Sequence, residues 1–371
     1  MPITNEPRDY AWGSTELLAD YLGRSASGGP EAELWLGAHP GCPAMVTEGE
    51  HAGVDLGAAI ERAGRAQPSI LLKVLAAAQP LSLQAHPDAS TAQAGFARED
   101  AAGIPRDAPH RSYRDPFAKP ELVVAVTQYE ALSGFRPAAE ALAVVRAIVR
   151  RDDRAAPLLE HLQAGDALSW LLSGDHAVEA VVAAVTAAAP ALADAHPAEA
   201  DTVDRLARTH PGDPGIAIAL LLNRVSLAPG EALFLPAGNL HAYLEGLGIE
   251  LMGPSDNVLR GGLTPKHVDV RELLAVVDAA PLHEPRLAAV RLDGATAYRP
   301  AAPFELRSVT GTHSVPGGRA LLLAIEPALV EVDGAVREVP AGGGAWIDTA
   351  DAFRVSSGQA WLALERDTPD A

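Results

Sequence analysis

The sequence is poor in cysteine, which bears on the compartment in which the protein works. Cys42 is the only cysteine among 371 residues. A single thiol cannot form an internal disulfide, so a reducing, cytoplasmic location is expected. Residues 1–6 contain neither a basic stretch nor an apolar one, so the sequence predicts no signal peptide there.

Long hydrophobic runs and basic clusters are also missing. No stretch approaches the roughly 18 uncharged apolar residues of a membrane span, and the longest candidate, 181–193, is interrupted by Pro190. The formal net charge of -19 repels nucleic acid phosphates and anionic lipids, and no Lys/Arg cluster offsets it. We therefore expect no nucleic acid or membrane partner, and a small anionic substrate would need a local group of cations. The oligomeric state stays open.

Lysine is scarce as well. Lysine and arginine together number 29, but only three of these residues are lysine. Lysine supplies a compact, titratable ammonium where arginine supplies a planar, permanently charged fork, so the remaining lysines are candidates for special roles. All three return below among the candidate site residues: Lys73, Lys119 and Lys266.

Hydrophobic periodicity predicts a mainly β protein with a helical insert. Residues 1–137 show short strands, with helices expected at 16–21 and 57–65. Residues 138–223 predict four to six short helices, with breaks at Pro157, Pro190 and Pro197 among others. The β pattern returns after Asn223, and Asp333-Gly334 predicts a hairpin turn.

Three short segments carry side chains that could bind a metal. Gln84 and His86 are two residues apart on a predicted strand and so share a face. Glu121 opens an apolar strand, where an unpaired carboxylate would be costly. Taken singly, the histidine is more typical of an ordinary packed side chain, and the glutamate of an ion pair with arginine.

The third segment is more specific. Gly230, Pro236, Gly238 and His241 have the spacing of a turn, a short strand, a second turn and an inward-facing histidine, which resembles a signature of the cupin barrels. Two imidazoles, a carboxylate and an amide oxygen suit zinc and leave coordination positions open, as a catalytic site requires. The predicted ligands of one zinc ion are Gln84, His86, Glu121 and His241.

Residues 250–266 mix charged residues and glycine without helical or strand periodicity. Gly261 and Gly262 allow a ligand to approach the backbone, and Arg260 and Lys266 supply cations. An alternative is a structural polar loop in which Asp256 pairs with Arg260.

Several motifs together resemble type I mannose-6-phosphate isomerase, a family within the cupin superfamily. The similarity runs in order from about residue 9 to 270, and the segments that carry it are 9–13, 32–40, 80–88, 119–121, 239–243 and 255–266. The resemblance implies a zinc enzyme that interconverts mannose 6-phosphate and fructose 6-phosphate through an enediolate. It also implies a cupin-type double-stranded β-helix barrel (1–137 plus 224–270), a helical domain (138–223) and a smaller β domain (271–371).

By the same resemblance, Gln84, His86, Glu121 and His241 are the zinc ligands and Arg260 is an active-site arginine. The substrate-binding set comprises Lys73, Ser82, Tyr243 and Lys266. Members of the family usually carry Asn-His directly before Lys-Pro-Glu, whereas this sequence has Phe117 and Ala118.

The catalytic base is less well determined. Glu250 ranks first, because burial would raise its pKa toward the range of a base. Lys119 ranks second, because a nearby divalent cation would lower the pKa of its ammonium. Asp256 ranks third, since orienting Arg260 is its simpler role. Two alternatives to the isomerase stay open: another metal-dependent cupin enzyme, such as an oxygenase, and a non-catalytic sugar-phosphate-binding cupin.

Overall fold

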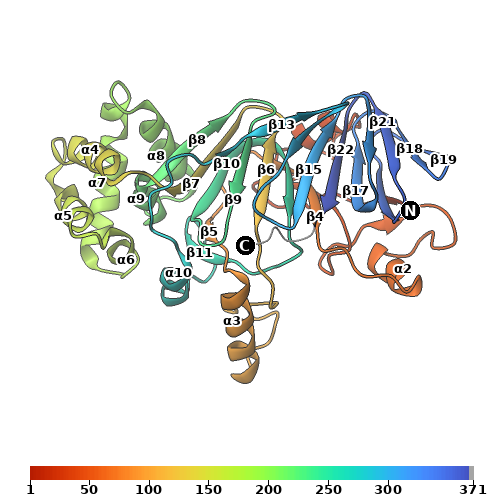
Figure 1. Cartoon of the computed structure of the whole chain (residues 1–371). Coiled ribbons are helices and arrows are strands. Elements are labelled where there is room, and N and C mark those ends of the chain that lie inside the picture. The colour runs from red at the N-terminus through yellow and green to blue at the C-terminus, as the bar shows by residue number, and fades with distance from the viewer. Residues whose placement is uncertain (367–371) are drawn as a thin grey trace.

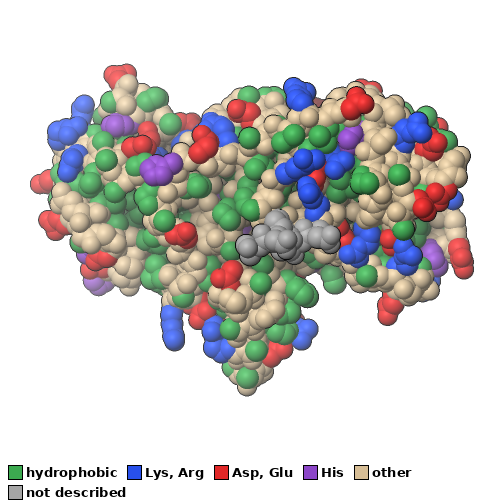
Figure 2. All heavy atoms as spheres, viewed as in Figure 1, with side chains coloured by type: hydrophobic (Ala, Val, Ile, Leu, Met, Phe, Trp, Pro, Cys, Tyr) green, Lys and Arg blue, Asp and Glu red, His purple; other side chains and the backbone are tan. Residues whose placement is uncertain are grey.

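A computed structural model describes residues 1–366 of the chain. Figure 1 shows three regions side by side: a group of helices, a central β region from which helix α3 projects, and a set of C-terminal strands. In this described part, no helix is both long and apolar enough to cross a membrane. On the face shown in Figure 2, acidic and basic side chains are interspersed, and no continuous basic surface is seen.

The first 137 residues form short strands and three helices. The strands are β1 (Pro2–Thr4), β2 (Glu33–Leu36), β3 (Met45–Val46), β4 (Leu71–Ala77), β5 (Leu83–Ala85), β6 (Glu121–Ala125) and β7 (Tyr129–Phe135). The helices are α1 (Leu17–Tyr21), α2 (Leu56–Arg62) and α3 (Ala89–Ala101). Only α1 and α2 were predicted. Helix α3 has no clear apolar stripe, and its main signal is the side chain of Asp88, which caps the amide of Thr91.

The predicted helical insert contains six α-helices and two short 3₁₀ turns. They are α4 (Ala138–Val149), η1 (Asp153–Ala155), α5 (Ala156–Ala164), α6 (Ala167–Leu171), α7 (His176–Leu192), α8 (Pro197–Thr209), α9 (Gly215–Ile218) and η2 (Ala219–Leu221). The predicted break at Pro190 is wrong, because this proline lies inside α7. Because it lies beyond the first turn, it removes one backbone hydrogen bond of the helix. Pro157 and Pro197 instead lie at helix starts, a position that proline tolerates.

The rest of the described chain is almost entirely β. The central strands are β8 (Leu222–Leu227), β9 (Ala232–Leu235), β10 (His241–Met252), β11 (Leu259–Gly262) and β12 (Arg286–Leu287), with helix α10 at Val270–Val276. The later strands are β13 (Ala289–Leu292), β14 (Ala295–Tyr298), β15 (Phe304–Val309), β16 (Thr312–Val315), β17 (Gly318–Ala324), β18 (Ala328–Val332), β19 (Ala335–Val339), β20 (Gly344–Thr349), β21 (Phe353–Ser357) and β22 (Ala360–Glu365).

Strand β10 joins the two halves of the central β region. Its first residues pair with β5 and β7, and its last residues pair with β4 and β6. The change occurs at a bulge between Tyr243 and Glu245, next to Gly246 with φ +123°. A Cβ at Gly246 would lie 2.6 Å from the carbonyl oxygen of Gln128, so the bend requires glycine. One continuous strand thus holds residues of both half-sheets around a common interior.

Hydrophobic packing extends from this central region to both sides. One buried cluster combines the inward faces of α4–α8 with Leu240, Leu244 and Leu259 of the central strands. Another combines β4, β6 and the second half of β10 with Phe304, Trp346 and Trp361 of the C-terminal strands. The central strands are therefore buried on both faces, which fits their nearly continuous apolar sequences.

The proposed boundaries at 137/138, 223/224 and 270/271 stay a prediction. Strand β1 pairs with β20 of the C-terminal region, and β12 pairs with β9 of the central region. These two pairings tie the N-terminal segment and the start of the C-terminal region to their neighbours.

Candidate metal centre and substrate site

Three buried side chains from three elements meet inside the central β region. His86 follows the short strand β5, Glu121 opens β6, and His241 opens β10. All three are at most 4% exposed. Their ligand atoms lie within 4.8 Å of one another, and among residues 1–366 they form the one such His/Cys/Asp/Glu group. The structure thus brings together three of the four predicted ligands as a candidate metal centre.

Backbone carbonyls orient both imidazoles. His86 donates from Nδ1 to the carbonyl of Asn257 at 2.7 Å, and His241 donates from Nδ1 to the carbonyl of Asn239 at 3.0 Å. A neutral imidazole that donates from Nδ1 carries its lone pair on Nε2, which is the usual arrangement of a histidine that binds a metal. Both Nε2 atoms face Glu121, one 3.3 Å from each carboxylate oxygen.

The protonation states fit a metal site. Burial, followed by the charge of Lys119, lowers the pKa of His86 to about 4, so this ring is neutral near pH 7. Burial raises the pKa of Glu121, but Lys119 and His86 lower it by more, so the group is a carboxylate. A lone pair of His86 therefore faces an anionic oxygen, and His86 Nε2 is buried without a hydrogen-bond partner. A cation bound between them would offset both the repulsion between the lone pair and the carboxylate and the lack of a partner for His86 Nε2.

The spacing of these atoms also suits zinc. Two ligands bound at about 2.1 Å with a tetrahedral angle lie about 3.4 Å apart. The two distances from Glu121 to the histidine Nε2 atoms are 3.3 Å each. The chemistry of the donor atoms and these two distances are therefore both compatible with zinc.

Gln84 lies beside this group. It sits on β5, opposite His241 of β10 on one side and Arg260 of β11 on the other, and it lines the same cavity as Glu121 and His241. Its Nε2 donates to Ser82 Oγ at 3.1 Å, which leaves its Oε1 available as a ligand. Its role as the fourth ligand remains a proposal.

A second buried cluster lines the same cavity and centres on Lys73. Its Nζ lies 3.1 Å from Glu250 Oε2 and 3.7 Å from Glu33 Oε1, and 4.6 Å from the ring centre of Trp35. Trp35 in turn donates to Glu33, and Tyr243 donates its hydroxyl to Glu250 at 3.1 Å. Lys73, one of the predicted substrate-binding residues, is therefore compensated by carboxylates.

The pKa values in this cluster follow from burial and from this pairing. Burial lowers the pKa of Lys73, but Glu250 and Glu33 raise it by more, so the ammonium is charged. Burial raises the pKa of Glu250 above its usual value, although Lys73 lowers it. Glu250 therefore holds a proton more readily than the metal-facing Glu121, whose pKa is lowered.

Lys119 pairs with a metal ligand. Its Nζ lies 3.0 Å from Glu121 Oε1, and the side chain is buried. Phe117, two residues before it, has a side chain that is 59% exposed. The Phe117–Ala118 pair that departs from the family pattern is thus close in sequence to the site, but adds no titratable group.

A separate group of cations lies beyond Gln84. Arg260 is half-buried on β11, and Lys266 is exposed in the segment that follows. Burial lowers the pKa of Lys266, and the charges of Arg260 and Arg114 lower it further. In residues 1–366, none of these three cations has a carboxylate within ion-pairing distance.

Asp256 does not neutralise the charge of Arg260 or of the two cations beside it. Its Oδ1 lies 3.5 Å from His39 Nε2, and its side chain is 48% exposed. The alternative of an Asp256–Arg260 ion pair is therefore not found in the described residues, and the proposed role of Asp256 in orienting Arg260 has no contact to support it.

Sequence reasoning did not single out several residues of this region. Glu33 and Trp35 lie in the segment 32–40, to which the sequence analysis assigned no chemical role. A carboxylate on a buried strand could have indicated that Glu33 belongs to a site. No sequence pattern around Arg114 indicates a functional role, because only the tertiary structure brings this residue near Arg260. The missed residues are Glu33, Trp35, Arg114, Asn239 and Asn257.

A buried His–Glu–His set among antiparallel strands is typical of the metal-binding proteins of the cupin class. Residues 1–138 match the model of the phosphomannose isomerase type I catalytic domain. Mannose-6-phosphate isomerase of Salmonella typhimurium is 39% identical over 75% of both chains, and that of Escherichia coli is 39% identical over 74% of both. The chain belongs to the type I phosphomannose isomerase family.

Solved structures agree over nearly the whole chain. A variant of phosphomannose isomerase from Salmonella typhimurium superposes with a TM-score of 0.88 at 33% identity, covering 99% of each chain. A zinc-bound mannose 6-phosphate isomerase superposes with a TM-score of 0.87, also at 33% identity and 99% of each chain. The predicted cupin fold is thereby confirmed, and the relatives support the isomerase over the oxygenase and the non-catalytic alternatives.

Proposed function

We propose that the chain is a zinc-dependent aldose–ketose isomerase that interconverts mannose 6-phosphate and fructose 6-phosphate. The observation that carries this proposal is the pair of carbonyl-oriented histidines whose Nε2 atoms both face Glu121 at 3.3 Å. The membership of the chain in the type I family supplies the reaction and the substrate pair. A cytoplasmic location is part of the proposal and rests on the single cysteine.

The residues that would hold zinc are Gln84, His86, Glu121 and His241. Isomerisation moves a proton between C2 and C1 of the open-chain sugar, and negative charge develops on an oxygen when that proton leaves. A bound zinc ion supplies Lewis-acid stabilisation of this charge. The chain itself shields these ligands from water and fixes them, because His86, Glu121 and His241 are buried and the two histidines are hydrogen-bonded to backbone carbonyls.

Glu250 is our choice for the base. A base for this reaction works best when its pKa lies near the working pH, and burial shifts the pKa of Glu250 in that direction. Lys73 and Tyr243 hold its two oxygens in place and can support its charged form. Lys119 forms an ion pair with Glu121, and Asp256 is exposed beside His39. As candidates for the base, both therefore rank behind Glu250.

The phosphate group would lie at Arg260 and Lys266, with Arg114 added to the pair. Three mutually repelling cations without carboxylate partners in residues 1–366 are costly, and a dianionic phosphate would offset that cost. Lys73 is not included among these phosphate-binding cations, since Glu250 and Glu33 already compensate its charge. Lys73, Ser82 and Tyr243 remain near the reacting end of the substrate, on the walls of the cavity.

A coupled assay for fructose 6-phosphate formation from mannose 6-phosphate tests the proposal. The purified chain should turn over, lose activity with a chelator and regain it with added zinc. His241→Ala should lose zinc and activity together, whereas His161→Ala, on the surface of the helical region, should keep both. Turnover that is unaffected by complete metal removal would refute the zinc-dependent reaction.

A further inference from the structure

Two segments without regular secondary structure meet next to the metal centre. One runs between strands β10 and β11, from 253 to 258, and the other leads from helix α3 to strand β6, from 102 to 120. Neither segment has a strand ladder or a helix to fix its backbone. Yet the first provides the carbonyl that orients His86, and the second ends on Glu121.

The side chain of Asn257 links these two segments. It is 0% exposed, and its Oδ1 accepts hydrogen bonds from the amides of Arg114 and Asp115 at 2.7 and 3.2 Å. Its Nδ2 donates to the carbonyls of Asp115 and Phe117 at 2.8 and 2.9 Å. Both ends of the amide are thus used, a pattern that a carboxylate or an apolar side chain cannot reproduce.

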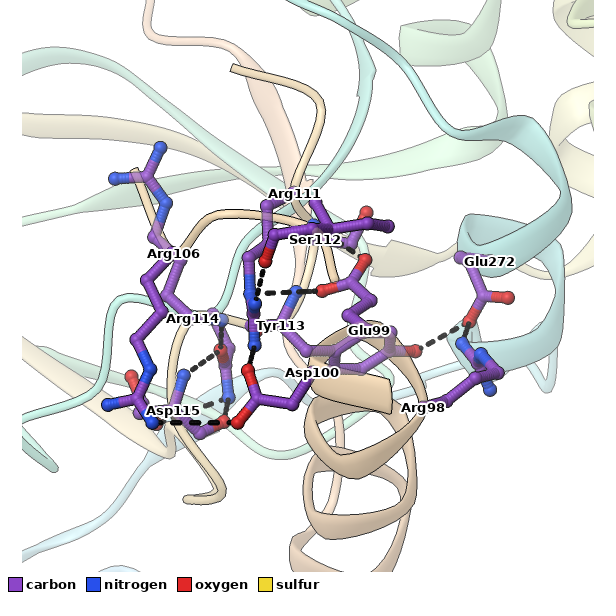
Figure 3. A network of polar contacts seen from close by, with 12 residues as sticks. Arg98, Glu99, Asp100, Arg106, Arg111, Ser112, Tyr113, Arg114, Asp115 and Glu272 are labelled. Atoms are coloured by element: carbon purple, nitrogen blue, oxygen red, sulfur yellow. Dashed lines mark hydrogen bonds and ion pairs between the residues drawn. The ribbon is translucent and has the colours of Figure 1, made fainter. Parts of the chain in front are cut away.

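The far side of the same loop is held independently. Figure 3 shows Glu99 of α3 and the loop residues facing one another. The Glu99 carboxylate accepts from the amides of Ser112 and Tyr113 at 3.1 and 2.8 Å, and Arg111 donates to the carbonyl of Tyr113. The hydroxyl of Tyr113 donates to Glu272 of α10. The loop is therefore anchored on α3 and α10 at one end and on Asn257 at the other.

We infer that Asn257 is a positioning residue. Its side chain holds segment 253–258 against the loop at 114–117, and this fixes the backbone carbonyl of Asn257 that orients the metal ligand His86. The ring of His86 is hydrogen-bonded to the backbone carbonyl of Asn257, and the side chain of Asn257 is hydrogen-bonded to the loop that leads to Glu121. A single residue thus sets the relative position of two of the metal ligands. This inference rests on the proposed metal site.

Zinc affinity, measured by competition with a chromogenic chelator, tests this role without an activity assay. Loss of a group that orients a metal ligand typically weakens binding 10- to 100-fold, so we expect about this loss in Asn257→Ala. Tyr113→Phe is the matched control, because it removes one hydrogen bond from the outer end of the same loop. It should lower the unfolding temperature but leave the zinc affinity at the wild-type value.

Ser255→Ala provides a milder second variant if Asn257→Ala does not fold. Ser255 Oγ accepts from the amide of Asn257 at 3.2 Å and donates to Asp115 at 2.8 Å, so its loss loosens the same clamp. A several-fold weaker zinc affinity supports the inference. Wild-type affinity in a folded Asn257→Ala, or in Ser255→Ala, would overturn it while leaving the isomerase proposal intact. A wild-type chain that binds no zinc would overturn both.

Discussion

Two glutamates of the cavity illustrate how position alters the chemistry of one residue type. Glu121 lies between two histidines and Lys119, and its pKa is held well below the usual value. Glu250 is equally buried and is paired with Lys73, yet its pKa is raised by burial. One carboxyl group is suited to bind a cation at all working pH values, and the other is suited to exchange a proton.

Replacement of Glu250 by glutamine tests its assignment as the base. Glu250→Gln should keep zinc and lower solvent-deuterium exchange at C2 of the substrate by about 10²- to 10⁴-fold, because the amide cannot take up the proton. Lys119→Met serves as the comparison, since it removes the second-ranked candidate. If Glu250→Gln exchanges at the wild-type rate with zinc bound, Glu250 is not the base.

Lys266 offers a separate test of phosphate recognition. Lys266→Ala should raise KM for mannose 6-phosphate by about tenfold, with little change in kcat, because it removes a charge-assisted contact made equally in the ground and transition states. Arg208→Ala, which removes an exposed cation on α8, should leave KM unchanged. An unchanged KM in Lys266→Ala, together with equal use of free mannose, would contradict the proposed phosphate site.

At the scale of elements, strand β10 carries most of the organisation of the site. It supplies His241 and Tyr243 in its first half and Glu250 in its second, with the bend at Gly246 between them. The positions of these side chains relative to one another depend on this bend. Glycine at this position therefore serves both the fold and the site.

Gly246→Ala should destabilise the protein by about 3 kcal/mol or more, because a Cβ there meets backbone atoms that cannot move away easily. Gly103→Ala is the matched control, since its φ is +71° but nothing lies within 4 Å of an added Cβ. It should cost only about 1 kcal/mol of backbone strain. Urea unfolding of the two variants measures the difference, and equal losses would show that the bend tolerates a side chain.

A buried carboxylate on β15 makes the C-terminal strands sensitive to acid. Burial raises the pKa of Glu305, but Arg307 and Arg299 lower it by more, so its net pKa lies below the usual 4.5. Its stabilising contribution is present above about pH 4.5 and is lost as the pH falls through the lower folded-state pKa.

Glu305→Gln should therefore cost about 1–2 kcal/mol near pH 7, a value reduced because Arg299 and Arg366 are 41% and 47% exposed. The difference from wild type should shrink below about pH 4.5 in thermal unfolding scans across pH. Glu338→Gln, on the exposed edge of β19, should show no such pH-dependent difference. A constant difference down to pH 3 would contradict this explanation.

Secondary structure was predicted best where turn chemistry is local. The hairpin predicted at Asp333-Gly334 is confirmed, with φ values of +52° and +77° between β18 and β19. Helix α3 was missed because its burial is slight and its apolar residues form no stripe. The break predicted at Pro190 failed because neighbouring helices α4 and α8 pack against α7 and outweigh the loss of one hydrogen bond.

For the whole molecule, the proposed metal site couples metal binding to folding. The residues of the candidate metal centre come from separate segments that only the folded chain brings together, so the proposed zinc ion would bind the native state and stabilise it. At free zinc about 1,000 times above Kd, this linkage is worth about 4 kcal/mol. Removal of zinc should therefore lower the unfolding temperature by several degrees in calorimetry, and re-addition should restore it. An unchanged transition would contradict tight binding of zinc to the native state.

The sequence by itself determined which donor atoms each motif offers, because strand alternation and turn residues act over a few neighbouring positions. Together with the family resemblance, this was enough to predict Gln84, His86, Glu121 and His241 as one metal set and to predict the cupin class, and the structure brings His86, Glu121 and His241 together. Only the tertiary structure decided which charges compensate one another. Lys73 meets Glu250 across paired strands, Arg114 joins Arg260 and Lys266, and Asp256 faces His39. These contacts depend on strand register and on the clamping of irregular loops, which no local pattern encodes.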